Sequence, residues 1–192
     1  RSTPEPIRVC ALQATPADWN HLRALYDAEI ARLDDFLGEF FDRLRADGSF
    51  DSTVIAIVSD HGEQFGEHGT LGHSGPMWEY IIRTPLILTG PGIPAGELLL
   101  APARNIDVAP TLLRLAGLEA PPHYEGSDLA PIWRKEETDE RIVIAEKRCC
   151  RVFVVGKWKY GVILETGEET LFDLDTDSGE TTNLIDVLPE MA

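Results

Sequence analysis

Thr53-Val54-Ile55-Ala56-Ile57-Val58 is the most strand-like run of this chain, and Ser59-Asp60-His61-Gly62 follows it directly. A continuous apolar and β-branched run after a helical segment is typical of an interior strand in a sheet that is buried on both faces. Pro85-Leu86-Ile87-Leu88 is a second such run. We therefore expect an α/β fold with strands at residues 53–58 and 85–88, and with functional groups where the strands end.

Segments with helical periodicity lie before, between and after these two strands in the sequence. Apolar residues recur at three- and four-residue steps from about residue 16 to residue 46, which predicts a long amphipathic helix packed against the sheet. Thr15 is its expected N-cap. Shorter helices are expected over residues 77–83 and over residues 107–115, the latter capped by Asp107.

Short apolar runs separated by turn residues fill the last quarter of the chain, and they predict an antiparallel meander. These runs are residues 142–144, 152–155, 157–164 and 171–174. The expected fold class is therefore α/β, with part of a sheet flanked by helices in residues 1–135 and a small antiparallel β subdomain in residues 136–192.

Composition narrows the possible partners. The chain has 192 residues with 17 Lys and Arg against 33 Asp and Glu, a formal net charge of −16. Such a chain should repel a phosphate backbone, so we expect no nucleic-acid partner, and a metal cation is the natural counter-ion. No apolar run reaches the length of about 18 residues that a membrane span needs. Cys10, Cys149 and Cys150 make no disulfide framework, which leaves the cellular compartment open.

Asp60 and His61 are the first candidates for a site. They follow the apolar run directly, where a carboxylate and a neutral imidazole are well placed to bind one metal ion. The same dipeptide also fits a simple capped turn. Gly62 would let the backbone turn sharply beside the ion.

The same loop holds further polar candidates, His68 and His73. Each has a structural alternative, because His68 also fits a solvated residue and His73 a loop residue that is hydrogen-bonded to backbone. Glu63 and Glu67 are four residues apart and also fit an exposed acidic face. Three of the five histidines nevertheless lie in one loop after an expected strand, which indicates a site.

Residues 58–69, Val-Ser-Asp-His-Gly-Glu-Gln-Phe-Gly-Glu-His-Gly, resemble the metal-binding strand end of the sulfatase family in the alkaline phosphatase superfamily. Further similar motifs follow in the family's order over nearly the whole chain. They are Gly72-His73-Ser74, Arg83-Thr84-Pro85-Leu86-Ile87, Asp107-Val108-Ala109-Pro110-Thr111, Gly126-Ser127-Asp128-Leu129, Leu171-Phe172-Asp173-Leu174 and Glu180-Thr181-Thr182-Asn183-Leu184.

The resemblance implies a function and residue roles. The fold would be part of a sulfatase/alkaline-phosphatase-like sheet, and the substrate a sulfate ester of a small molecule or a glycan. Asp60 and His61 would bind a divalent metal, calcium by expectation, with zinc or manganese as alternatives. His73 would be catalytic and contact the sulfate or the leaving oxygen, and His68 would line the substrate pocket.

Two family features are missing from these 192 residues. Neither Cys10 nor Cys149 begins the Cys/Ser-x-Pro-x-Arg nucleophile motif, and the family's N-terminal Asp-Asp metal pair is absent. We therefore expect a C-terminal fragment that is inactive alone, partnered by a missing N-terminal half or by a second copy. Two alternatives stay open: a metal-dependent phosphodiesterase or phosphoethanolamine transferase of the same superfamily, and a non-catalytic binding or structural module.

Overall fold

The computed structural model describes residues 14–136 and 141–188. Its first element is the helix α1 (Pro16–Ala46), which confirms the predicted helix. Thr15 caps it: the Thr15 hydroxyl accepts from the Asp18 N–H at 3.3 Å, and the Asp18 carboxylate accepts from the Thr15 N–H at 2.7 Å. This reciprocal pair is a capping box, which satisfies two backbone donors that the first turn leaves free.

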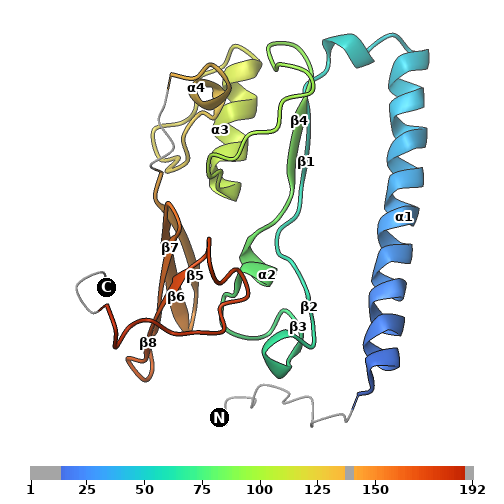
Figure 1. The fold of residues 1–192 in the computed structure, drawn as a ribbon. Coiled ribbons are helices and arrows are strands. Elements are labelled where there is room, and N and C mark those ends of the chain that lie inside the picture. Colours follow the sequence, from blue (N-terminus) through green and yellow to red (C-terminus); the bar gives the residue numbers. More distant parts are fainter. Residues whose placement is uncertain (1–13, 137–140, 189–192) are drawn as a thin grey trace, which may run out of the picture.

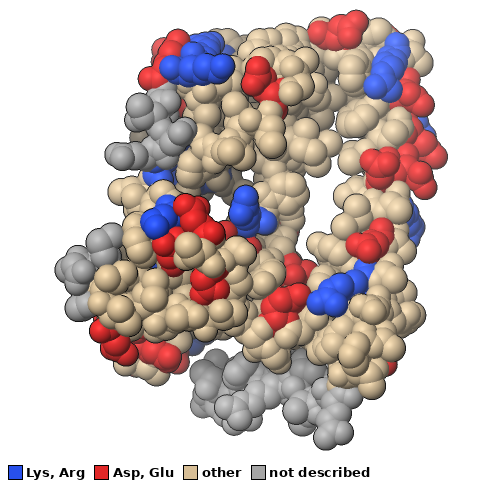
Figure 2. All heavy atoms as spheres, in the orientation of Figure 1, with Lys and Arg blue, Asp and Glu red and all other residues tan. Residues whose placement is uncertain are grey.

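The apolar stripe of α1 is uncovered, so the expectation that it packs against the sheet is wrong for the described residues. No α1 residue is buried, and Leu33 and Phe36 are 54% and 65% exposed. The helix stands beside the strands and meets the rest of the chain near its ends, through Tyr26 on Phe65 and Phe41 on Phe50 (Figure 1). Figure 2 shows open space between α1 and the strands.

The strand β1 (Ile55–Val58) follows the short 3₁₀ helix η1 (Phe50–Ser52) and pairs antiparallel with β4 (Leu86–Thr89). Both predicted strands therefore form. Burial on both faces was a wrong expectation, since the β1 side chains are half-buried and Val58 is 42% exposed. Among the described residues β4 is the only strand beside β1, and the alternation of half-buried and exposed residues along β4 leaves one face of the pair open.

Short elements fill the polar loop between β1 and β4. They are β2 (Gln64–Phe65), η2 (Glu67–Gly69), β3 (Leu71–Gly72) and α2 (Glu79–Ile82). β2 and β3 pair antiparallel with Gln64 opposite Gly72 and Phe65 opposite Leu71. The helix that we predict over residues 77–83 is thus the single turn α2.

The helices α3 (Asn105–Leu115) and α4 (Ala130–Trp133) come next along the chain. The expectation that Asp107 is the N-cap of α3 is wrong in position, because the helix begins two residues earlier. Asp107 instead accepts from the Arg104 backbone N–H at 2.9 Å from inside the first turn. The acid therefore still satisfies a free donor at the helix start.

The predicted meander is confirmed as a four-stranded antiparallel sheet. It runs in the order β5 (Val143–Lys147), β6 (Cys150–Val155), β7 (Trp158–Ile163) and β8 (Glu169–Asp173). A small apolar core of Met77, Cys150 and Val152 joins this sheet to the segment before α2. The α/β class with a C-terminal antiparallel sheet is confirmed, while the division at residues 135 and 136 stays a prediction. No helix in the described ranges has the length and apolarity to cross a membrane.

Candidate metal and catalytic site

The end of β1 is held in place before it delivers Asp60 and His61. The Ser59 N–H donates to the Pro85 carbonyl at 3.3 Å, and the Asn105 side-chain amide donates to the Ser59 carbonyl at 3.0 Å. The Ser59 hydroxyl donates to the His61 carbonyl at 2.7 Å. Contacts to the residue before β4, to the first residue of α3 and within the loop itself therefore fix the backbone of this strand end.

Gly62 is required here by a close approach of two backbone segments. Its N–H donates to the Ile81 carbonyl at 2.7 Å, and a Cβ at this position would lie 2.0 Å from the Tyr80 carbonyl oxygen. The φ of Gly62 is not in the left-handed region, so the close approach is what requires a glycine at this position. The contact presses the Asp-His loop onto α2.

Asp60 and His61 can both reach one ion. The His61 Nε2 lies 3.9 Å from the Asp60 Oδ2, and metal–ligand distances of about 2.0–2.6 Å allow an ion to sit between two such atoms. The His61 Nδ1 lies 2.9 Å from the Gly62 carbonyl oxygen, which only accepts, so Nδ1 carries the proton and Nε2 keeps its lone pair. The Asp60 side chain is 89% exposed. This donor pair fits a divalent metal that takes further ligands from outside the pair.

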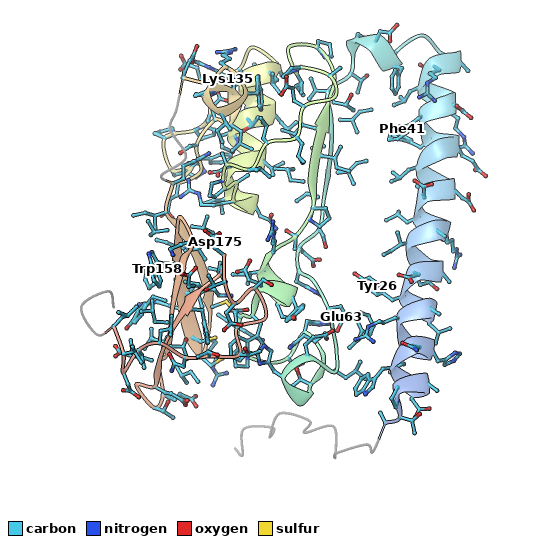
Figure 3. The ribbon with its side chains drawn as sticks, viewed as in Figure 1. Tyr26, Phe41, Glu63, Lys135, Trp158 and Asp175 are labelled. Carbon is cyan, nitrogen blue, oxygen red and sulfur yellow. The ribbon has the colours of Figure 1, made fainter. Side chains whose placement is uncertain are left out.

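The pairing of β2 with β3 brings Glu63 and His73 together. One step beyond the Gln64–Gly72 pair, Glu63 stands opposite His73, and the Glu63 Oε2 lies 3.1 Å from the His73 Nδ1. Glu63 lies where the chain leaves β1 for β2 (Figure 3). A carboxylate accepts, so Glu63 favours the His73 tautomer with its proton on Nδ1 and a free Nε2.

Three residues therefore converge at the end of β1. The ring centroids of His61 and His73 are 4.0 Å apart, with planes tilted by 30°. His61, Glu63 and His73 each offer one ligand atom, and these atoms all lie within 4.8 Å of one another. Of the residues predicted for the site, the structure brings His61 and His73 together and leaves Asp60 beside them.

The exposed acidic face was a wrong interpretation of Glu63 and Glu67. The Glu63 side chain is 21% exposed and that of Glu67 is 24% exposed. Glu67 accepts from the Phe65 N–H and from Arg23 of α1 at 3.1 Å. Burial acts to raise the pKa of Glu67, but these hydrogen bonds hold it below its ordinary value. Glu67 is thus a structural ion that ties α1 to β2.

His68 lies apart from this cluster. Its ring stacks on Trp78 with centroids 3.9 Å apart and planes 7° from parallel, and Tyr80 approaches edge-on at 6.2 Å. The backbone of His68 has a φ of 52°, in the left-handed region. The exposed imidazole therefore belongs to an aromatic wall next to α2.

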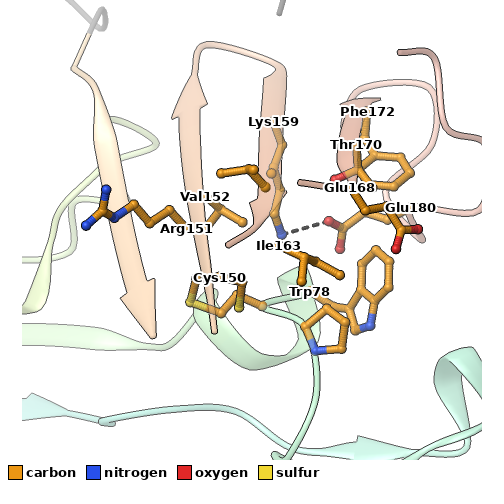
Figure 4. Close-up of a pocket in the computed structure, with 14 residues that line it drawn as sticks. Trp78, Cys150, Arg151, Val152, Lys159, Ile163, Glu168, Thr170, Phe172 and Glu180 are labelled. Atoms are coloured by element: carbon orange, nitrogen blue, oxygen red, sulfur yellow. Dashed lines mark ion pairs between the residues drawn. The ribbon is translucent and has the colours of Figure 1, made fainter. Parts of the chain in front are cut away.

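A separate pocket lies between the C-terminal sheet and the segment Pro76–Trp78 (Figure 4). Its floor holds Lys159, which is 2% exposed and pairs with Glu180 at 2.7 Å and with Glu79 at 3.1 Å. The buried Glu180 Oε1 makes this ion pair but no hydrogen bond. No residue predicted for the site lines this pocket. Beside it, the Lys147 Nζ lies 3.4 Å from the carbonyl oxygens of His73 and Gly75, which supports the loop of His73.

Comparison with known proteins gives two family matches. The family described as Sulfatase matches residues 7–118, and the family described as N-sulphoglucosamine sulphohydrolase, C-terminal, matches residues 66–191. The choline-sulfatase of Rhizobium meliloti (strain 1021) is 39% identical over 170 residues, which cover 84% of this chain and 33% of that protein.

Solved structures share the fold. BT4656, solved in complex with its substrate D-glucosamine-2-N,6-O-disulfate, superposes with a TM-score of 0.75 at 26% identity, over 84% of this chain and 36% of that one. The phosphonate monoester hydrolase SpPMH from Silicibacter pomeroyi reaches a TM-score of 0.79 at 24% identity, over 95% of this chain and 41% of that one, which shows the fold alone.

The chain spans about a third of the length of the curated relatives that it matches. Within that span the first family match covers more than half of the chain and includes the end of β1 with the histidine loop. The chain belongs to the sulfatase family.

Proposed function

We propose that this chain forms the C-terminal part of a metal-dependent sulfatase that hydrolyses sulfate esters. The observation that carries the proposal is the meeting of His61, Glu63 and His73 at the end of β1, in a chain of the sulfatase family. A carboxylate–imidazole pair next to candidate metal ligands is suited to acid–base work on an anionic ester.

In this proposal Asp60 and His61 hold a divalent metal, calcium by first expectation, with zinc or manganese as alternatives. The ion, when bound, would act as a Lewis acid that offsets the negative charge on the sulfate oxygens. The 3.9 Å separation of the Asp60 and His61 donor atoms supports this assignment. The remaining ligands would come from outside these 192 residues.

His73 is the proposed general acid. Glu63 holds the Nδ1 proton, so in the imidazolium form of His73 the second proton sits on Nε2, and Nε2 is the atom that passes it to the leaving oxygen. His73 is 52% exposed, which leaves it accessible to a substrate. His68, with its ring stacked on Trp78, is the proposed flat wall of the substrate pocket.

The nucleophile is proposed to lie outside this chain. Cys149 and Cys150 are free, with their sulfur atoms 3.7 Å apart. Burial first, and then the neighbouring Cys149, raise the pKa of the Cys150 thiol, which makes it a poor nucleophile. Cys10 lies outside the described residues. We therefore expect the isolated chain to be inactive until the missing N-terminal half joins it.

The test is turnover by the complete protein. Choline sulfate, an aryl sulfate and a sulfated glucosamine are the first substrates to assay, since the relatives include a choline-sulfatase and an arylsulfatase, and BT4656 was solved with a glucosamine disulfate substrate. We expect Asp60→Asn and His73→Gln to lower kcat/KM by about 10²–10⁴-fold, while His123→Gln, an exposed control, leaves it unchanged.

Phosphodiester and phosphonate substrates form the second arm of this assay. Turnover of these with no turnover of sulfate esters would favour the phosphodiesterase or transferase alternative. A complete protein that turns over neither class would leave the non-catalytic module as the better description. Metal-dependent sulfatase activity of the isolated chain would refute the requirement for the missing half.

A further inference from the structure

We propose that His61, Glu63 and His73 form a binding site of their own for a divalent transition-metal ion of the zinc class, one that does not depend on Asp60. Their ligand atoms all lie within 4.8 Å of one another, and Asp60 is not part of this group. Two imidazoles and one carboxylate are a donor set that binds zinc in enzymes.

The Glu63–His73 contact already has the spacing of two ligands. The 3.1 Å between the Glu63 Oε2 and the His73 Nδ1 is about the distance between two ligands of a tetrahedral ion with bonds near 2.0–2.1 Å. An ion can therefore take the place of the shared proton, which moves to Nε2 of the same ring. This exchange leaves the charge of His73 unchanged.

His61 has to turn to complete the site. An imidazole binds an ion in the plane of its ring, and the two histidine rings are stacked with only 30° between their planes. Their side chains are 40% and 52% exposed, so no tightly packed neighbours oppose the rotation. Entry of the ion should therefore break the ring stack.

The donor atoms also select the kind of metal. Two nitrogens and one oxygen suit zinc and other late first-row transition metals, whereas calcium prefers a ligand shell made of oxygens alone. The Asp60–His61 pair and the three-residue cluster share His61, so one ion in either place excludes the other. If the proposed sulfatase function holds, zinc removes His73 from proton transfer and inhibits ester turnover, whereas calcium does not.

Binding of Co²⁺ to the 192-residue chain tests this site without any assay of activity. Cobalt reports through its visible absorption, and Zn²⁺ is then added to displace it. We expect Glu63→Gln and His73→Gln each to weaken binding by roughly tenfold to a hundredfold. The matched control Asp60→Asn should stay within about threefold of the parent chain, and circular dichroism checks that each variant is folded.

Loss of binding in Asp60→Asn, with Glu63→Gln unaffected, would overturn the proposal and favour the Asp-His pair. Loss of binding in all three variants would show that Asp60 also binds the ion. It would likewise overturn the proposal of a site that does not depend on Asp60. Absence of saturable Co²⁺ binding by the parent chain would do the same. If Glu63→Gln fails to fold, the more exposed His73→Gln decides. None of these results depends on sulfatase turnover, which the ester assays test separately.

Discussion

Asp107 shows how a single residue of this chain organises its surroundings. Its carboxylate is fully buried and accepts from Arg104 at 2.8 Å, from the Ser127 N–H at 2.8 Å and from Arg141 at 3.3 Å. It thereby ties the start of α3 to the loop before α4. A buried carboxylate is tolerated only when its charge and its lone pairs are satisfied in this way.

Removal of this charge should be costly. We expect Asp107→Asn to lower the free energy of unfolding by about 3–5 kcal/mol, because Arg104 and the largely buried Arg141 lose their counter-ion. Urea denaturation measures the change. Asp34→Asn, on the exposed surface of α1, is the control and should shift stability by no more than about 0.5 kcal/mol. Equal effects of the two substitutions would contradict this role of Asp107.

Asp107 also predicts a pH dependence. Burial acts to raise its pKa, but Arg104 and the backbone N–H groups of Ser127 and Arg104 outweigh it and hold the pKa below the ordinary 3.8. The unfolded chain then binds this proton more readily than the folded chain. The stabilisation is therefore complete above pH 3.8 and is lost as the pH falls below it.

The urea midpoint of the parent chain should accordingly drop on acidification below about pH 4, and that of Asp107→Asn should drop less. Asp18, Asp47, Asp173 and Asp177 also have lowered pKa values, so the variant keeps part of the slope. The difference between the two curves isolates Asp107. Parallel curves would show that its carboxyl does not titrate with folding.

For single residues, the sequence predicted the positions of Asp60 and His61, because their place directly after a strand is a local property. It did not predict the partner of His73. Glu63 meets His73 only through the register of β2 and β3, and two-residue strands carry no periodicity that a sequence pattern reveals. The glycine-rich turn between them, with Gly66 and Gly69 at positive φ, was the one available signal for a hairpin.

Among the elements, α1 was the easiest to predict and the hardest to place. Its start, its length and its apolar stripe follow from local residue types, and the structure confirms the first two. How the stripe packs depends on the other elements that lie against α1, and the residue pattern of one helix does not reveal those elements. The same holds for β1 and β4, whose strand character was predicted and whose antiparallel pairing was not.

Gly38 offers a test of α1 as a helix. It lies in the middle of α1 on the polar side, and a Cβ there would meet no atom within 4 Å. We expect Gly38→Ala to stabilise the chain by about 0.5–1 kcal/mol, since alanine loses less backbone entropy in a helix. Circular dichroism and urea denaturation measure the gain. A loss of stability would mean that Gly38 needs its conformational freedom.

In the whole molecule, a few long-range contacts join parts that the sequence keeps apart. Glu180 accepts from the Glu79 N–H at 2.6 Å across 101 residues and pairs with the buried Lys159. These contacts fasten α2, and with it the loop of the candidate site, to the C-terminal sheet. No spacing rule predicts such a meeting, whereas the sheet itself follows from alternation and turns.

The exposed stripe of α1 gives a prediction about the complete protein. In the isolated chain Leu33 and Phe36 are more than half exposed, so the double substitution Leu33→Gln and Phe36→Gln should change the free energy of unfolding by at most about 0.5 kcal/mol. If, as proposed, an N-terminal half joins this chain and covers the stripe, both side chains become core. The same double variant of the complete protein should then lose several kcal/mol, about 2–5 for each side chain.

Ala31→Gln, on the opposite side of α1, is the matched control, because it introduces the same side chain on a face that should stay in water in both proteins. Urea denaturation of the six proteins gives the comparison. A small effect of the double variant in both contexts would mean that the stripe stays uncovered in the complete protein. A large effect in the isolated chain alone would mean that a second copy of the chain covers the stripe there, and the free energy of unfolding of the isolated chain would then depend on its concentration.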